Sequence, residues 1–290
     1  MALEIKNVTN KFGDRIILND ISIELEPGVY GLLGENGAGK STLMRIICGI
    51  IKPNEGSVVY NGYNTTEEPE SFRNILGFLP QDFRYYPDFT GLKFLLYIAA
   101  LKGLDKLSAK KKCNELLHLV GLEDVKNKKI KKYSGGMKQR LGIAQAMIND
   151  PEVLILDEPT VGLDPKERVR FRNLISSFSK KKVIILSTHI VSDIEYIADE
   201  ILILNKGIIE TRGVSSELVK EIEGQVWECL MESTSDDEIS AKYIISNKKH
   251  EAEGTVLRII SENQPTMNAK KVQPTLEDLY LFYLGEDVVK

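Results

Sequence analysis

The chain has 290 residues and a formal net charge of −4, with 42 acidic and 38 basic side chains. This length suits one sizeable domain with a small appendage, and the mildly acidic balance argues against a dedicated nucleic-acid-binding protein. The apolar runs are strand-length, far short of the roughly 20 residues that a membrane span needs. The three cysteines are widely spaced and lack the grouping of a metal site or a disulfide pair. The N-terminus lacks a basic stretch followed by an apolar one, which predicts a cytoplasmic protein.

The first third of the chain changes from antiparallel to α/β character. Short alternating segments at residues 3–8, 16–18 and 22–25 predict a meander of antiparallel strands. An apolar strand follows at residues 29–33 and leads through a glycine-rich turn into a helix beginning near Lys40. This strand–loop–helix unit predicts the start of an α/β core.

The middle of the chain predicts a block of helices and then a parallel crossover. Helical periodicity covers residues 90–101, 108–120 and 134–149. Two apolar strands, at residues 153–156 and 183–187, flank a helix over residues 165–179 whose first residue is a proline. We therefore expect a parallel βαβ unit after the helical block.

The last third of the chain predicts a hairpin and an appendage. Strand-like runs at residues 200–204 and 208–211 are joined by a turn that contains glycine. Three more strand-like runs and a closing helix follow, at residues 225–231, 242–246, 256–261 and 275–284. We expect a small C-terminal α+β region, without internal repeats.

A glycine-rich loop at residues 34–41, with the sequence GENGAGKS, fits the pattern G-x-x-x-x-G-K-[ST]. It lies between a predicted strand and a predicted helix, where backbone N–H groups and the helix dipole can hold phosphate. Lys40 would pair the β- and γ-phosphates of a nucleotide, and Ser41 would bind Mg²⁺. The alternative is a glycine-rich turn with a chance Lys-Ser pair.

Two carboxylates, Asp157 and Glu158, end the apolar strand at residues 153–156. The carboxyl edge of a parallel sheet is where ligands bind, so Asp157 would hold Mg²⁺ and Glu158 would activate the attacking water. Taken alone, such a pair is more often part of a solvated loop. The glycine-rich loop favours the functional interpretation.

The segment YSGGMKQR at residues 133–140 resembles the signature motif of the ABC ATPase family, in the family's order just before the carboxylate strand. The resemblance implies that Ser134, Gly135 and Gly136 face a nucleotide held by the opposite subunit, at a helix start suited to phosphate. An ordinary serine-capped helix is the alternative. Met137 replaces the family's commoner glutamine.

Four further residues match family elements by order. The resemblance implies that Gln81 touches Mg²⁺ or the attacking water, that Asp164 lines the subunit boundary, and that His189 contacts the γ-phosphate and Glu158. Phe12 stands where the family places an aromatic ring against adenine. The alternatives are a loop amide for Gln81, a strand-end histidine for His189 and a core residue for Phe12. His118 and His250 have no such context.

The combined prediction is an α/β fold with a P-loop NTPase core, mostly a parallel sheet with flanking helices. An N-terminal antiparallel β-subdomain, an inserted helical subdomain at about residues 82–150 and a C-terminal appendage complete it, with an ATPase domain at residues 1–215 and an accessory domain at 216–290. The predicted cofactors are ATP and Mg²⁺. The predicted catalytic residues are Glu158, His189 and Gln81, and the predicted metal ligands are Ser41, Gln81 and Asp157. The predicted nucleotide-binding residues are Phe12, Gly34, Glu35, Asn36, Gly37, Ala38, Gly39, Lys40, Ser41, Thr42, Ser134, Gly135, Gly136 and Asp164.

The resemblance further implies a subunit that hydrolyses ATP as a homodimer or heterodimer, bound to a separate membrane-spanning subunit at the inner face of the cell membrane. The segment QPTLEDLYL at residues 273–281 resembles the terminal segment of exporter-type ABC subunits. A regulatory subunit, such as a sensor or immunity protein, stays an alternative. DNA-repair and translation ATPases are less favoured, because the chain has neither a coiled-coil insertion nor a second cassette. The basic run at residues 126–132 is expected to be a solvated face, with a lipid or partner contact as its alternative.

Overall fold

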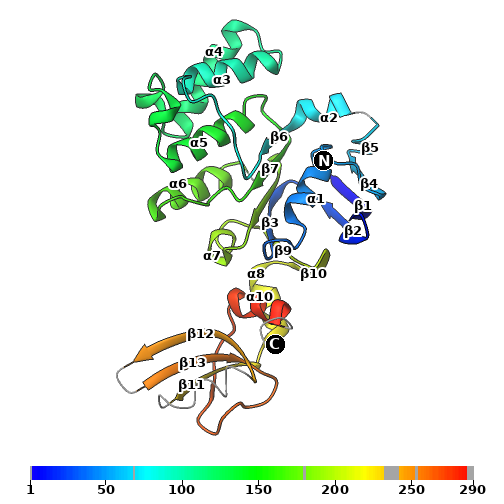
Figure 1. The fold of residues 1–290 in the computed structure, drawn as a ribbon, viewed down its shortest axis with the longest axis vertical. Coiled ribbons are helices and arrows are strands. Elements are labelled where there is room, and N and C mark those ends of the chain that lie inside the picture. Colours follow the sequence, from blue (N-terminus) through cyan, green and yellow to red (C-terminus); the bar gives the residue numbers. More distant parts are fainter. Residues whose placement is uncertain (1, 68, 179–180, 232–241, 252–253, 286–290) are drawn as a thin grey trace.

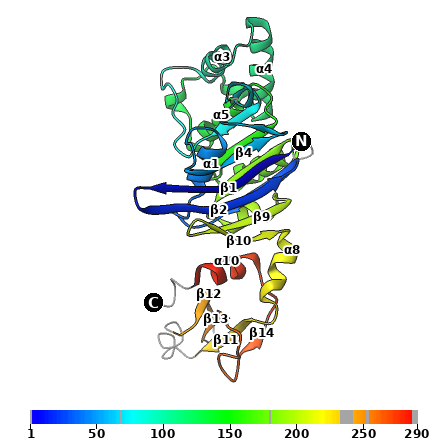
Figure 2. The same cartoon turned by 90° about the vertical axis from the view of Figure 1, so that its right-hand side faces the viewer.

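The computed structural model describes residues 2–67, 69–178, 181–231, 242–251 and 254–285. The helical block lies at one end of the molecule's long axis and the C-terminal sheet at the other, and between them the N-terminal sheet lies beside the central sheet (Figures 1 and 2). The fold has the predicted α/β architecture, a mostly parallel central sheet with flanking helices and antiparallel additions.

The N-terminal sheet is antiparallel, as predicted, in the order β2-β1-β4-β5. Its strands are β1 (Leu3–Phe12), β2 (Arg15–Leu25), β4 (Glu55–Tyr60) and β5 (Tyr63–Asn64). The prediction of separate strands at 16–18 and 22–25 was wrong, because β2 runs through both. Asp20 takes a left-handed φ of 51° between them, and its backbone N–H donates to Thr9 Oγ1. The polar Asn19-Asp20 pair is thus a local irregularity within one strand.

The central sheet has the order β10-β9-β3-β8-β7-β6, in which all neighbours are parallel except the edge pair β9 and β10. Its strands are β3 (Gly28–Leu33), β6 (Leu76–Leu79), β7 (Val153–Asp157), β8 (Val183–Thr188), β9 (Glu200–Asn205) and β10 (Ile208–Gly213). The predicted crossover from β7 to β8 is confirmed, and its helix α6 (Pro165–Ser176) ends three residues earlier than expected. Strands β3, β7 and β8 are buried along their whole length, which explains their continuous apolar runs.

The helical block packs beside the β6 edge of the central sheet (Figure 1). Its main helices are α3 (Gly91–Leu101), α4 (Lys106–Leu119) and α5 (Gly135–Ala146), with two short 3-10 turns, η1 (Glu123–Val125) and η2 (Ile130–Lys132), between α4 and α5. Thr90, Asp105 and Ser134 cap the three helices with their side-chain oxygens. The described residues before position 215 also form the helices α1 (Lys40–Ile47), α2 (Pro69–Ile75) and α7 (Val191–Ile194).

The C-terminal region begins with α8 (Ser215–Leu218) and η4 (Val219–Ile222) and forms a separate antiparallel sheet in the order β12-β13-β11-β14. Its strands are β11 (Val226–Met231), β12 (Ile244–Glu251), β13 (Gly254–Ile260) and β14 (Lys270–Lys271). The last helix, α10 (Leu276–Leu284), lies between this sheet and the central one (Figure 2). Its apolar residues Leu276, Leu279 and Leu284 belong to the same hydrophobic core as Ile201 and Ile203 of β9. The C-terminal region thus shares a core with the central sheet, and the division of the chain into two domains between residues 215 and 216 remains a proposal.

Candidate active site

A cavity of about 470 Å³ opens where the central sheet's strands end and the N-terminal hairpin folds over them. Its lining consists of Phe12, Arg15, Ile17, Glu35, Asn36, Gly37, Gly39, Lys40, Ser41, Thr42, Gln81 and Glu158. All of these except Arg15 and Ile17 were predicted from the sequence. The register of the β1–β2 hairpin, in which Phe12 pairs with Arg15, brings the other two to the cavity, and no motif in the sequence marks them.

The glycine-rich loop wraps tightly around one end of this cavity. Gly39 has a φ of 111°, and a Cβ atom there would lie 2.8 Å from the carbonyl oxygen of Ile17. A Cβ atom on Gly34 would collide with the carbonyl oxygen of Leu204. Within the described structure no side chain caps the start of α1, so its first N–H groups and its positive dipole end are free for an anion.

Lys40 is almost completely buried, at 6% exposure. Its Nζ donates to the carbonyl oxygens of Gly34 (2.6 Å) and Glu35 (3.1 Å), and it lies 3.7 Å from Oε1 of Glu158. Burial lowers the pKa of Lys40, and the nearby carboxylates Glu158 and Asp157 oppose that shift. The loop therefore holds an ammonium group at the cavity wall, where phosphate oxygens can replace the carbonyls.

Glu158 is buried at 5% exposure and has a left-handed φ of 50°, a strained conformation for a residue other than glycine. Its backbone N–H donates to Ser187 Oγ (2.9 Å), and that hydroxyl donates to Asp157 Oδ1 (2.5 Å). His189 Nδ1 lies 3.1 Å from both carboxylate oxygens of Glu158. The strands β7 and β8 thus hold a carboxylate at the cavity with an imidazole beside it.

The predicted metal ligands fit the chemistry of Mg²⁺. Ser41 and Gln81 line the cavity, and Asp157 is buried directly before Glu158 at the end of β7. A hydroxyl, an amide carbonyl and a carboxylate are oxygen ligands of the kind that Mg²⁺ prefers, and this ion usually retains several waters. Asp157 does not line the cavity itself, so it would act through such a water.

The signature residues lie away from this cavity. Ser134 caps α5 by accepting from Met137 N at 3.2 Å, and Gly135 and Gly136 form that helix's exposed or half-exposed first turn. Asp164 caps α6 in the same way, by accepting from Glu167 N at 2.9 Å. In the described part of the chain, none of these residues lines the cavity.

Burial decides two of the open alternatives. Asp157 and Glu158 are 3% and 5% exposed, so they do not belong to a solvated loop. Phe12 is 55% exposed, so it is not a core residue. His118 pairs with Glu123 at 2.7 Å, and His250 contacts Thr255, both away from the cavity.

Asp193, in the short helix α7, is a buried charged residue that the sequence analysis missed. It accepts from Thr160 Oγ1 at 2.5 Å and pairs with Arg168 at 3.0 Å. These contacts tie the loop after Glu158 to α6 and α7. Asp193 follows β8 closely along the chain, but its side chain carries no motif by which sequence reasoning could have found it.

Comparisons with known proteins identify the family. The family described as "ABC transporter" matches residues 18–161. The uncharacterized ABC transporter ATP-binding protein YhcH of Bacillus subtilis is 33% identical, over 98% of this chain and 96% of its own length. The chain belongs to the ABC transporter ATP-binding proteins. It is therefore an ATP-binding subunit of the ABC ATPase family.

Other relatives agree with this assignment. The Nod factor export ATP-binding protein I of Burkholderia lata is 34% identical over 75% of this chain and 72% of its own length. A bacterial ABC transporter cassette solved as a dimer matches with a TM-score of 0.67 and 27% identity, over 73% of this chain and 98% of the cassette. The same cassette has also been solved in a post-hydrolysis state bound to ADP and Pi. Among the described residues of the present ABC protein, no helix combines the length and apolarity needed to cross a membrane.

Proposed function

We propose that this ABC subunit hydrolyses ATP as a dimer and powers export through separate membrane subunits. The observation that supports this best is the position of Gln81. Gln81 lines the nucleotide cavity, whereas its two neighbours, Pro80 and Asp82, line a second groove on the helical block. A change at the nucleotide can therefore reach the groove through one short segment.

The chemistry follows from the cavity's geometry. The loop N–H groups and Lys40 would bind the β- and γ-phosphates, and Phe12 would stack on adenine. Glu158 would accept a proton from the attacking water, and His189 would orient that carboxylate. Ser41, Gln81 and Asp157 would supply ligands to Mg²⁺, whose charge offsets that of the phosphates.

Dimerisation would complete the site. Ser134, Gly135 and Gly136 lie at the start of α5, whose first turn is exposed or half-exposed and lies outside the cavity of its own chain. The positive end of this helix is therefore available to a nucleotide on a second subunit. Asp164 starts the neighbouring helix α6, and Arg140 of α5 pairs with Glu167 of α6 at 2.8 Å. These two helix starts would face the partner together. The dimeric cassette among the similar structures supports this arrangement.

The second groove suits a short helix from a membrane subunit. It has a volume of about 720 Å³, and Phe83, Tyr85, Tyr86, Phe94, Tyr97, Ile98 and Leu101 contribute most of its lining. Tyr86, Tyr97 and Leu101 are 49%, 38% and 67% exposed. Exposed aromatic and aliphatic groups in one groove are typical of a binding surface for an amphipathic helix.

The direction of transport is inferred from relatives. A relative named for Nod factor export and another named for linearmycin resistance cover about three quarters of this chain. We infer export here on the name of the Nod factor relative, and we propose that the subunit is cytoplasmic and peripheral at the inner face of the cell membrane.

Copurification tests the membrane partnership. A tagged chain would be isolated from detergent-solubilised membranes of its native cells, and integral membrane proteins bound to it would be identified by mass spectrometry. We expect one membrane subunit to bind the parent and the control Leu107→Arg, whose residue is exposed but outside the groove. Tyr97→Arg should no longer bind the membrane subunit, but it should retain the ATPase rate of the isolated chain.

If Tyr97→Arg and the parent copurify the membrane subunit equally, the groove is not its binding site. If no membrane protein binds the parent, the proposed role as a subunit of a transporter is contradicted. The purified complex in liposomes then separates transport from sensing. A transporter moves substrate across the bilayer when ATP is hydrolysed, whereas a sensor does not.

A further inference from the structure

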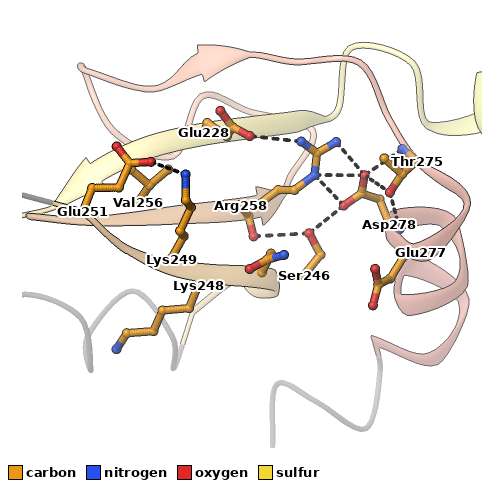
Figure 3. A pocket seen from close by; sticks show the side chains of 11 residues that line it. Glu228, Ser246, Lys248, Lys249, Glu251, Val256, Arg258, Thr275, Glu277 and Asp278 are labelled. Atoms are coloured by element: carbon orange, nitrogen blue, oxygen red, sulfur yellow. Dashed lines mark hydrogen bonds and ion pairs between the residues drawn. The ribbon is translucent and has the colours of Figure 1, made fainter. Parts of the chain in front are cut away.

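Helix α10 is firmly attached to the C-terminal sheet at its N-terminal end. Asp278 is 1% exposed, and its carboxylate accepts from Arg258, Ser246 and Thr275, with Arg258 Nη2 at 2.8 Å. Thr275 and Asp278 also form a capping box at the start of the helix. Figure 3 shows these side chains converging at one end of a cleft of about 460 Å³.

The charges of this cleft are matched within the protein. Arg258 also donates to Glu228 at 3.1 Å, and Lys249 pairs with Glu251 at 2.6 Å. Such a self-satisfied network leaves little uncompensated charge for a ligand and instead fixes the position of the helix. The cleft is therefore better interpreted as an anchor of α10 than as a binding site.

The other end of α10 reaches the nucleotide side of the molecule. The side-chain Nδ2 of Asn205, the last residue of β9, donates to the carbonyl oxygen of Tyr283 at 3.0 Å. Asn205 also lines a cavity that shares Glu35, Asn36 and Gly37 with the nucleotide cavity. This hydrogen bond thus joins α10 to the strand end directly behind the glycine-rich loop.

The turn that follows Asn205 braces that loop. The backbone N–H of Gly207 donates to the carbonyl oxygen of Ala38 at 3.1 Å, and its own carbonyl accepts from Asn19 N at 2.9 Å. Gly207 has a φ of 83°, and a Cβ atom there would collide with the carbonyl oxygen of Ile17. A shift of this turn cannot be absorbed locally, so it would move the loop or the hairpin that carries Phe12.

An electrostatic effect on Tyr280 of α10 also connects this helix to the nucleotide cavity. Burial, with a smaller contribution from Glu35 and Glu158, raises the pKa of the Tyr280 hydroxyl to about 12. These two carboxylates belong to the nucleotide cavity. The helix therefore lies within the electrostatic reach of the cavity as well as in contact with its supporting turn.

We propose that Asn205 is a positioning residue through which the C-terminal region sets the affinity of the site for ATP. By tying α10 to the β9–β10 turn, it holds the glycine-rich loop in its phosphate-binding shape. This inference rests on the proposed function, because it concerns the same nucleotide site. Since Asn205 lies outside the nucleotide cavity, it should affect binding far more than the chemical step.

The chain offers a matched control. The same Asn205 amide donates to Glu210 Oε1 at 3.2 Å, so Glu210→Ala removes that bond and leaves the link to Tyr283. We expect Asn205→Ala to raise the KM for ATP and the Kd for ADP about three- to tenfold, the range of one net hydrogen bond, with kcat changed less than about twofold. Glu210→Ala should match the parent in both.

A parent chain that neither binds nor hydrolyses ATP would contradict the proposed function. If the parent is active but Asn205→Ala and Glu210→Ala have the same KM for ATP and the same Kd for ADP, only the positioning role of Asn205 is contradicted. An equal loss of kcat and kcat/KM in Asn205→Ala would also overturn it, because that pattern marks the chemical step.

Hydrogen exchange of the unmutated chain gives a test that does not depend on the variant's folding. Coupling between two sites is reciprocal, so saturating ADP or the non-hydrolysable analogue AMP-PNP should slow amide exchange in α10 as well as in the glycine-rich loop. Protection of the loop with no change in α10 would overturn the inference.

Discussion

His189 Nδ1 lies 3.1 Å from both carboxylate oxygens of Glu158, at the end of two buried parallel strands. This contact supports Glu158 as the residue that accepts the proton of the attacking water, with the imidazole holding the carboxylate toward the cavity.

Glu158→Gln should remove the general base while preserving the cavity's shape. We expect ATP hydrolysis, measured as phosphate release, to fall about 10²-fold or more, with ATP binding retained. Lys40→Ala should instead lose binding, because it removes the buried ammonium that lies 3.7 Å from Glu158. Glu200→Gln, in β9, serves as the control for a carboxylate outside the cavity; hydrolysis at the parent rate in Glu158→Gln would contradict the assigned base.

Phe12→Ala should weaken nucleotide binding about tenfold, the magnitude of one base–aromatic stack. The ring is 55% exposed, so its loss costs the fold little and the effect should appear in the Kd measured by calorimetry. Phe12→Tyr retains the π-face and should bind as the parent does. Tyr63→Ala removes a comparably exposed ring from the same sheet and should leave the Kd unchanged; a matching loss there would argue against stacking.

Ser134→Ala should block ATP-dependent dimerisation, measured by light scattering in a Glu158→Gln background. The substitution also removes a helix cap, which costs about 1 kcal/mol of stability. Thr90→Ala is therefore the matched control, since Thr90 caps α3 through the same kind of bond, to Lys93 N at 3.1 Å. Both variants should lose similar stability, but only Ser134→Ala should stay monomeric with ATP. If Thr90→Ala also stays monomeric, the loss of a helix cap by itself explains the failure to dimerise.

Asp278→Asn should destabilise the attachment of α10 by about 3 kcal/mol, because it leaves Arg258 without its buried partner. Burial opposes ionisation of Asp278, but hydrogen bonds from Arg258, Ser246 and Thr275 outweigh it and hold its pKa below the ordinary value of 3.8. A depressed pKa stabilises the fold above that ordinary value and loses this contribution as the pH falls through the folded-state pKa.

Thermal unfolding of the parent and of Asp278→Asn checks this prediction. Their difference in Tm should be constant from pH 7 to about 5 and should shrink below about pH 4. Glu277→Gln changes the neighbouring exposed carboxylate and should show no such difference. A difference between the parent and Asp278→Asn that persists undiminished into acid would contradict the role of the ionised carboxylate.

Much of the fold follows from local patterns. The strand, glycine-rich loop and helix at residues 28–47 could be predicted because each pattern there reflects nearby backbone geometry. The predicted break within β2 was wrong because the polar Asn19-Asp20 pair imitates a turn, and its left-handed residue is accommodated by pairing with β1. The strands β4 and β5 were missed because glycine and polar residues obscure their alternation.

The sequence by itself determined the glycine-rich loop, the carboxylate pair and the serine at the start of α5, since these depend on residues within one turn or strand end. Only the tertiary structure decided that Arg15 and Ile17 line the cavity and that Asn205 joins α10 to the supporting turn. Asn205 and Tyr283 lie 78 positions apart, and contacts over such a separation are set by how whole elements pack. No local pattern encodes that packing.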